Sequence, residues 1–224
     1  FYKRQSTGYR EFIETWVHEV KTPIASSLLL IENHPDEVTR SIGEEIGKID
    51  GFVEQALYYS RSNSVEKDYL VKKSSLKEMV YGAVRRHASA LIENKVTVSV
   101  EDVDLTVYTD VKWVDFILGQ LFVNSIKYKQ DPARIRIYAQ ERDNRIALYI
   151  ADNGIGMSEA DAARAFEKGF TGENGRRYAK STGMGLYLCR KLCDKLGLSI
   201  TLTSCPGSGT TVRIVFPKGT MHLL

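Results

Sequence analysis

The sequence has little cysteine, no long apolar run and little net charge. Its 224 residues include three cysteines, an odd number and too few for the disulfide framework of a small secreted domain. No apolar stretch approaches the roughly 20 residues that a membrane-spanning helix needs. The 31 basic and 28 acidic side chains leave a formal charge of +3, which argues against a nucleic-acid partner. The composition therefore favours an ordinary globular protein of the reducing cytosol.

Two of the cysteines, Cys189 and Cys193, are four residues apart on one face of a predicted helix. A metal site would need more ligands, and no further pair of histidines or cysteines lies nearby in the sequence. We therefore interpret both residues as thiols of the hydrophobic core.

The first sixty residues have the pattern of two amphipathic helices. Apolar residues recur every three or four positions from about Tyr9 to Asn33 and again from Val38 to Leu57. The residues between them, Asn33-His34-Pro35-Asp36, predict a tight turn, so the two helices form an antiparallel hairpin. Such a hairpin cannot bury two apolar stripes alone. We therefore expect a homodimer in which two hairpins form a four-helix bundle.

Helical and strand patterns alternate in the rest of the chain. Polar residues from Ser60 to Ser64 predict a linker, and Ser75 with Glu78 forms a capping box for a helix that extends to about Asn94. Asp110 can cap a second helix. Further segments have the pattern of strands at 96–100, 105–108, 134–138, 145–150, 198–204 and 210–216, and of a helix at 186–196.

These patterns predict an α+β fold with two domains. The first is the helical hairpin, residues 1–61, and residues 62–73 are a linker. Residues 74–224 form an α/β sandwich, because helices alternate there with mostly antiparallel strands and would cover one face of the sheet.

His18 is the most informative residue of the first helix. It stands in His18-Glu19-Val20-Lys21-Thr22-Pro23. A neutral imidazole nitrogen is a competent nucleophile toward phosphorus. A lone histidine on an amphipathic helix is more often a surface residue, and Thr22, one turn further on, can simply soften the helix before Pro23. The neighbouring motifs decide between these readings.

Three later motifs combine asparagine, aspartate and glycine. They are Asn124-Ser125-Ile126-Lys127-Tyr128, Asp152-Asn153-Gly154-Ile155-Gly156 and Gly183-Met184-Gly185-Leu186. Alternating glycines let a backbone approach a ligand closely, and amides that begin a helix can bind phosphate oxygens. Each motif alone is weak, because solvated helix residues and simple turns have the same composition.

Together these motifs resemble the sequence boxes of bacterial sensor histidine kinases. Residues 18–23 are similar to the phosphoacceptor box, 124–128 to the N box, 152–157 to the first glycine box, 166–170 to the F box and 183–186 to the second glycine box. The resemblance extends from about residue 10 to 217. Residues 16–23 and 166–175 are similar in particular to the intramembrane-sensing, bacitracin-sensor-like kinases of Gram-positive bacteria.

The resemblance implies catalytic roles for three residues of the first helix. His18 would accept the γ-phosphoryl group of ATP, with Glu19 as general base. Thr22 would position a water molecule that hydrolyses the phosphoryl group on a partner response regulator. The chain would then have both kinase and phosphatase activity.

The resemblance also implies an ATP–Mg²⁺ site in the second domain. Asn124 would bind Mg²⁺, and Gln120, which replaces a second asparagine of many members, would contact the ion directly or through a neighbour. Asp152 would accept a hydrogen bond from the adenine amino group, which selects ATP over GTP. The other expected nucleotide contacts are Lys127, Tyr128, Gly154, Gly156, Gly183, Gly185 and Leu186.

Residues 157–182 predict a mobile, glycine-rich lid over ATP. Related kinases often have an arginine, which contacts phosphate, where this chain has Gly172. Arg176, Arg177 or Lys180 could take over that contact from a position further along the chain.

The function implied is phosphoryl transfer from ATP to His18 and then to an aspartate of a response regulator receiver domain. The subgroup adds cell-envelope or antimicrobial-peptide stress signalling, with a membrane transporter as sensory partner. The chain would be the cytoplasmic part of a protein anchored in the bacterial membrane by segments that it does not include. The alternatives are a dimeric nucleotide-binding scaffold without kinase activity, and another ATPase of the same sandwich fold.

Overall fold

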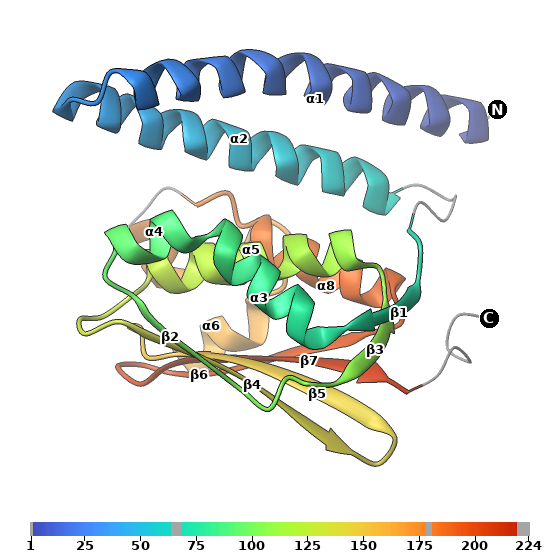
Figure 1. Ribbon diagram of the computed structural model, residues 1–224. Coiled ribbons are helices and arrows are strands. Elements are labelled where there is room, and N and C mark those ends of the chain that lie inside the picture. The colour runs from blue at the N-terminus through green and yellow to red at the C-terminus, as the bar shows by residue number, and fades with distance from the viewer. Residues whose placement is uncertain (1, 64–68, 178–180, 219–224) are drawn as a thin grey trace. The chain divides into compact units, whose positions relative to one another are not determined.

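The computed structural model describes residues 2–63, 69–177 and 181–218, with the side chains of all but 2–11, 176 and 177. The chain divides into two compact units, residues 1–68 and 69–224, and each is described by itself. The first unit consists of two long helices, α1 (Tyr2–Asn33) and α2 (Glu37–Asn63), as Figure 1 shows. They form the expected antiparallel hairpin.

The turn between the helices is fixed by reciprocal hydrogen bonds that begin α2. Asp36 Oδ1 accepts the N–H of Thr39 at 2.7 Å, and Thr39 Oγ1 accepts the N–H of Asp36 at 2.8 Å. These bonds satisfy two backbone donors that a helix N-terminus leaves unpaired. The bond from the Thr39 backbone is also the main reason why the pKa of Asp36 lies below its ordinary value.

The predicted linker at Ser60 to Ser64 was wrong in its first four residues, because α2 continues through Asn63. The polar side chains there bond locally within the helix. The Ser62 hydroxyl and the Asn63 amide both donate to the Tyr59 carbonyl at 2.8 Å. Composition alone did not show this, because serine and asparagine are also common in loops.

The second unit is built on a five-stranded sheet. Its strands are ordered β2-β4-β5-β7-β6, with β2 parallel to β4 and all other neighbours antiparallel. A separate antiparallel pair joins β1 to β3. The strands are β1 (Lys72–Ser75), β2 (Thr97–Glu101), β3 (Thr106–Thr109), β4 (Arg134–Arg142), β5 (Arg145–Asp152), β6 (Ser199–Cys205) and β7 (Gly209–Pro217).

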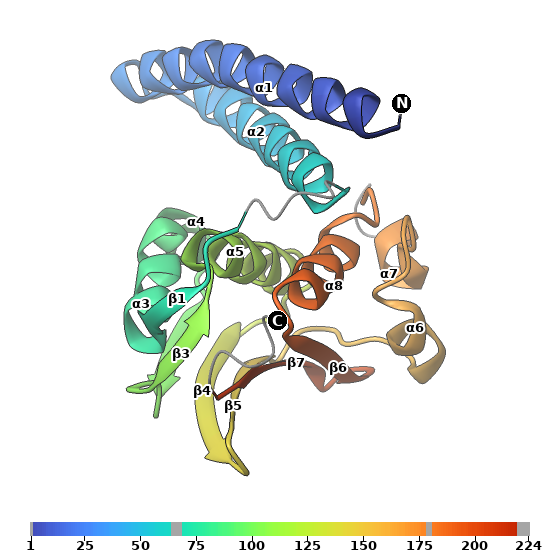
Figure 2. The ribbon, with the colours of Figure 1, turned by 90° about the vertical axis from the view of Figure 1, so that its right-hand side faces the viewer.

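Helices cover one face of this sheet, as Figure 2 shows for α3, α5 and α8. The α+β fold class is therefore confirmed. The helices of the unit are α3 (Leu76–Arg86), α4 (Ala88–Glu93), α5 (Val111–Lys127), α6 (Glu159–Arg164), α7 (Gly172–Arg177) and α8 (Gly185–Lys195). The predicted single helix to Asn94 is interrupted at His87, where φ is −97° and ψ is 9°, and so forms α3 and α4.

The core lies between α5, α8 and the sheet. Phe122 of α5, Leu188 of α8 and Phe216 of β7 are fully buried there. Cys189 and Cys193 are also buried on the inner face of α8, as expected for core thiols, and burial raises the pKa of Cys193 to about 12. These contacts fix the ends of α5 and α8, where the candidate site residues lie.

Asp110 connects the start of α5 to the segment before β1. Its Oδ1 accepts the N–H of Trp113 at 3.0 Å, as predicted for a cap, and its Oδ2 accepts the N–H of Leu70 at 2.7 Å. Asp110 is buried, so its bond to Trp113 is shielded from water, whereas its bond to Leu70 is only partly buried. Ser75, by contrast, accepts a single exposed bond from the N–H of Glu78 at 3.2 Å.

We expect Asp110→Ala to lower the free energy of unfolding of the second unit by about 2–3 kcal/mol, because the buried N–H of Trp113 and the part-buried N–H bond of Leu70 lose their acceptor. The matched cap variant Ser75→Ala should cost about 1 kcal/mol or less. Urea unfolding followed by the fluorescence of Trp113, in a Trp16→Phe background, measures both changes. Equal losses would contradict the role given to Asp110.

Candidate nucleotide-binding site and phosphoacceptor helix

Asp152 ends β5, and its carboxylate is oriented by three hydrogen bonds. Oδ2 accepts the Ser125 hydroxyl of α5 at 3.1 Å, and Oδ1 accepts the N–H groups of Gly154 at 2.9 Å and Thr210 at 3.2 Å. A carboxylate offers about four acceptor positions. One position on Oδ2 therefore remains for a ligand that donates a hydrogen bond, such as an exocyclic amino group.

Burial raises the pKa of the Asp152 carboxyl above its ordinary value, although the hydrogen bonds from Gly154, Ser125 and Thr210 oppose this rise. Because this pKa is raised, the folded protein binds the proton of Asp152 more tightly than the unfolded chain does, which stabilises the fold at low pH. This stabilisation is lost as the pH rises from the ordinary pKa through the folded-state pKa. A donor from a ligand would favour the ionised form and offset this loss.

The two glycines after Asp152 allow close backbone approach. A Cβ on Gly154 would lie 2.3 Å from the carbonyl oxygen of Tyr128, and one on Gly156, where φ is +63°, would lie 2.0 Å from the carbonyl oxygen of Cys205. The N–H of Ile155 donates to the same Tyr128 carbonyl at 2.9 Å. Glycine is therefore required here by the protein's own backbone.

The end of α5 contacts the segment that leads to α8. Lys127 Nζ donates to the Ser181 hydroxyl at 3.2 Å, and the Tyr128 hydroxyl lies 3.1 Å from the same oxygen. Two turns earlier, Gln120 Oε1 lies 2.9 Å from the place where a Cβ of Gly185 would be. Residues 120–128 and residues 181–185, far apart in sequence, therefore lie together.

The start of α8 has the properties of an anion site. Gly183 has φ +65°, and a Cβ there would lie 2.4 Å from the carbonyl carbon of Gly169. The N-cap residue, Met184, makes no side-chain hydrogen bond to the helix. The N–H groups of the first turn, including that of Leu186, can therefore bind phosphate oxygens, which the helix dipole also favours.

The donor set suits a hard cation that is bound mainly through phosphate. Among the described side chains, no group of three or more His, Cys, Asp or Glu could bind a metal ion. The amide oxygens of Asn124 and Gln120, four residues apart on α5, are ligands that Mg²⁺ accepts when phosphate oxygens and water complete its shell. Gln120 is buried against Gly185, so the half-buried Asn124 is the better-placed ligand.

The segment predicted as a lid contains α6 and α7. Asn174 of α7 donates to the Gly156 carbonyl at 2.7 Å, which joins this segment to the first glycine box. The side chains of Arg176 and Arg177 and the whole of Lys180, the suggested phosphate contacts, lie outside the described residues.

The first unit presents His18 to solvent. The side chains of His18 and Glu19 are exposed, whereas that of Val17 is buried, because successive helix residues point about 100° apart. The Thr22 hydroxyl donates to the His18 carbonyl at 3.2 Å, a common local bond for threonine in a helix.

Two ion pairs connect the helices on either side of His18. Glu14 Oε1 lies 3.2 Å from Arg61 Nε, and Lys21 Nζ lies 3.3 Å from Asp50 Oδ1. Glu14 is one turn before His18 and Lys21 is one turn after it. These pairs join α1 to α2 next to the candidate phosphoacceptor.

Residues 109–220 match the family of histidine kinase-, DNA gyrase B- and HSP90-like ATPases. The chain belongs to this ATPase family. It is 35% identical over 210 residues to the sensor histidine kinase YxdK of Bacillus subtilis and 37% identical over 218 residues to the sensor protein kinase GraS of Staphylococcus aureus. These matches cover 92% and 95% of the chain, but only 64% and 62% of the two relatives.

A solved structure shows the same fold. The Acinetobacter baumannii histidine kinase AdeS has a TM-score of 0.66 and 19% sequence identity, over 89% of this chain and 95% of that one. The ATPase family match over residues 109–220 supports ATP binding by the second unit.

Several residues of this ATPase site were not predicted from the sequence. Ser125, Ser181 and Asn174 bond to predicted site residues, and Ser125 is a buried polar residue on a largely apolar helix. A polar residue on an apolar helix is visible in the sequence and could have marked Ser125 as a candidate. Ser181 and Asn174 gave no such signal, because their partners are known only from the tertiary structure.

We expect Gly156→Ala to lower nucleotide affinity at least tenfold and to reduce thermal stability, because the Cys205 carbonyl and the turn after β5 must move apart. Gly207→Ala is the matched control. Gly207 also has a positive φ, +74°, but its Cβ would have no atom within 4 Å. Titration with a fluorescent ATP analogue and thermal unfolding measure both effects. Equal effects of the two variants would show that only backbone conformation matters.

Proposed function

We propose that the chain is the catalytic core of a sensor histidine kinase. It would transfer the γ-phosphoryl group of ATP to His18 and then to an aspartate of a response regulator receiver domain. The observation that carries this proposal is the Asp152 carboxylate, which has three fixed donors and one unused acceptor position, in an ATPase domain. A hairpin with an exposed His18-Glu19 pair precedes that domain in the same chain.

The site geometry supports a role for each part of ATP. The adenine amino group would donate to Asp152 Oδ2, where the carbonyl oxygen of guanine would meet a second acceptor instead. The phosphates would lie near Lys127 and the first turn of α8. Mg²⁺, bound to phosphate oxygens and Asn124, would neutralise charge during transfer.

Phosphoryl transfer requires mainly positioning and charge neutralisation. The exposed His18 ring is accessible to a nucleotide, and a neutral ring nitrogen would attack the γ-phosphorus while the bond to the bridging oxygen of ADP breaks. Glu19, the next residue, would accept the proton from the other ring nitrogen. The product is a phosphohistidine and ADP.

Exposed apolar side chains on the hairpin support dimerisation. A second hairpin that covered them would complete a four-helix bundle. The exposed apolar residues of the hairpin are Phe12, Trp16, Leu29, Leu30, Val38, Ile42, Ile49 and Phe52.

The subgroup resemblance in residues 166–175 supports a place in cell-envelope stress signalling. The proposal includes a membrane transporter as sensory partner and anchoring in the bacterial membrane. Within the described residues, no helix is sufficiently long and apolar to cross a bilayer. The anchor proposed would therefore belong to the part of such a kinase that this chain does not span.

Incubation with Mg²⁺ and γ-labelled ATP, followed by acid and alkali washes, tests the phosphoacceptor. His18→Ala should lose alkali-stable, acid-labile label, whereas His34→Ala should retain it. His34 is the matched control, because it is another exposed histidine of the hairpin and its ring bonds to the Leu30 carbonyl. Both variants should bind ATP normally. Label on His18→Ala would contradict the assignment, and wild-type protein that binds ATP without labelling would be a nucleotide-binding scaffold.

Thr22→Ala should retain autophosphorylation but dephosphorylate a phosphorylated receiver domain at least tenfold more slowly, if the hydroxyl positions the attacking water. Thr15→Ala, which changes another exposed threonine of α1, is the control. The rate of phosphate release from the purified receiver domain measures the effect. An unchanged rate for Thr22→Ala would contradict a catalytic role and leave the hydroxyl only its local bond to the His18 carbonyl.

A further inference from the structure

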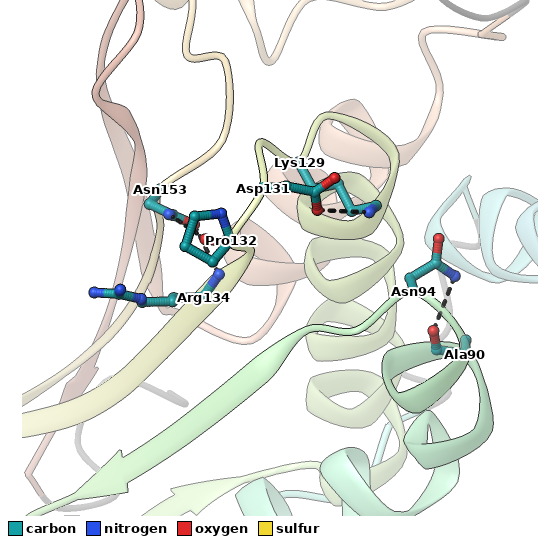
Figure 3. Close-up of polar contacts among 7 residues, drawn as sticks. All are labelled: Ala90, Asn94, Lys129, Asp131, Pro132, Arg134 and Asn153. Atoms are coloured by element: carbon teal, nitrogen blue, oxygen red, sulfur yellow. Dashed lines mark hydrogen bonds and ion pairs between the residues drawn. The ribbon is translucent and has the colours of Figure 1, made fainter.

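Asn153 follows the adenine-binding residue Asp152, yet its side chain contacts a different part of the chain. Its Oδ1 accepts the N–H of Arg134 at 2.7 Å, and its Nδ2 donates to the carbonyl of Pro132 at 2.8 Å, as Figure 3 shows. The backbone N–H of Asn153 also donates to the Arg134 carbonyl at 3.3 Å. The side chain thus bridges the turn after β5 to Arg134, the first residue of β4, and to Pro132 just before that strand.

Gln130 makes a second bridge between the same two segments. Its Nε2 donates to the Gly154 carbonyl at 2.7 Å. Together with the bond from the Ile155 N–H to the Tyr128 carbonyl at 2.9 Å, these contacts connect residues 152–155 to the connection between α5 and β4. That connection begins at Tyr128, directly after Lys127. A displacement of the turn would therefore also displace the end of α5.

Both bonds of this bridge are exposed, and among side chains of this length only an amide makes the two together. The Arg134 N–H donates and the Pro132 carbonyl accepts, and an asparagine side chain offers the matching acceptor and donor. Aspartate could accept but could not donate, and alanine could do neither. A turn without the bridge would have more conformational freedom, which nucleotide binding would then have to remove.

We propose that Asn153 is a positioning residue of the nucleotide site, with Gln130 as its second support. Both side chains bond to backbone groups of the protein and would act on the nucleotide only through them. They fix the distance between Asp152, which binds the base, and Lys127 and Asn124, which lie near the phosphates. The inference rests on the proposed ATP site and adds the residues that preorganise it.

The test compares ATP dissociation constants and kinetic parameters of variants that contain both units of the chain. Asn153→Ala should raise the dissociation constant and the KM for ATP about tenfold, which corresponds to one lost net hydrogen bond. Its kcat at saturating ATP should stay within about twofold, because bound adenine restores the turn through Asp152. Gln130→Ala should likewise raise the KM while leaving kcat nearly unchanged. Its loss of thermal stability should be smaller than that of Asn153→Ala.

Two control variants separate positioning from general stability. Asn94 also donates its amide to a backbone carbonyl, that of Ala90 at 2.9 Å, but at the end of α4 (Figure 3). Asn94→Ala should lower thermal stability and leave the KM unchanged. Asp131→Asn removes the exposed ion pair with Lys129 from the same connection, and should also leave the KM unchanged.

The outcomes are distinguishable from failure of the kinase proposal. Direct binding of a fluorescent ATP analogue requires no phosphoryl transfer, so it measures the positioning effect even if His18 is never labelled. Unchanged affinity in both Asn153→Ala and Gln130→Ala would overturn the inference. Equal changes in KM for Asn94→Ala and Gln130→Ala would do so too, since the effect would then follow from stability. If Asn153→Ala does not fold, the KM and the affinity of Gln130→Ala, compared with those of Asn94→Ala, decide.

Discussion

The candidate site depends on the contact between the carbonyl of Tyr128 and the backbone of Gly154 and Ile155. The carbonyl accepts the N–H of Ile155 at 2.9 Å and lies where a Cβ of Gly154 would come within 2.3 Å. The last turn of α5 and the turn after β5 are therefore in backbone contact, and only glycine permits it. Because α5 is packed in the core, this contact transmits a fixed position to Asp152 and its neighbours.

From this contact the site extends in two directions. Toward the base, Asp152 is oriented by donors from α5, β7 and its own turn, and retains one acceptor position. Toward the proposed phosphate position, Lys127 reaches the segment before α8, and the N-cap residue of α8, Met184, makes no side-chain hydrogen bond to that helix. In the proposed complex, the two ends of the nucleotide would be bound by groups that a single helix, α5, relates to one another. His18 belongs to a separate unit and is exposed, as a phosphoryl acceptor must be.

The sequence predicted best where structure is decided locally. The caps at Ser75 and Asp110 follow from side chains within a few residues. The sequence did not show where each strand lies in the fold. For example, β3 pairs with β1 in a separate sheet rather than with the five-stranded sheet. The partners of Asp152 and Gly156 were also missed, because a hydrogen bond between residues far apart in sequence leaves no local pattern. The motifs located the candidate site, but not the contacts that fix its geometry.

The most direct test of the account is the structure of this protein with Mg²⁺ and a non-hydrolysable ATP analogue. The account predicts that the adenine amino nitrogen lies within hydrogen-bonding distance of Asp152 Oδ2. It also predicts phosphate oxygens at the first turn of α8 and the metal ion next to Asn124. Adenine bound away from Asp152, or phosphates remote from Gly185, would contradict it.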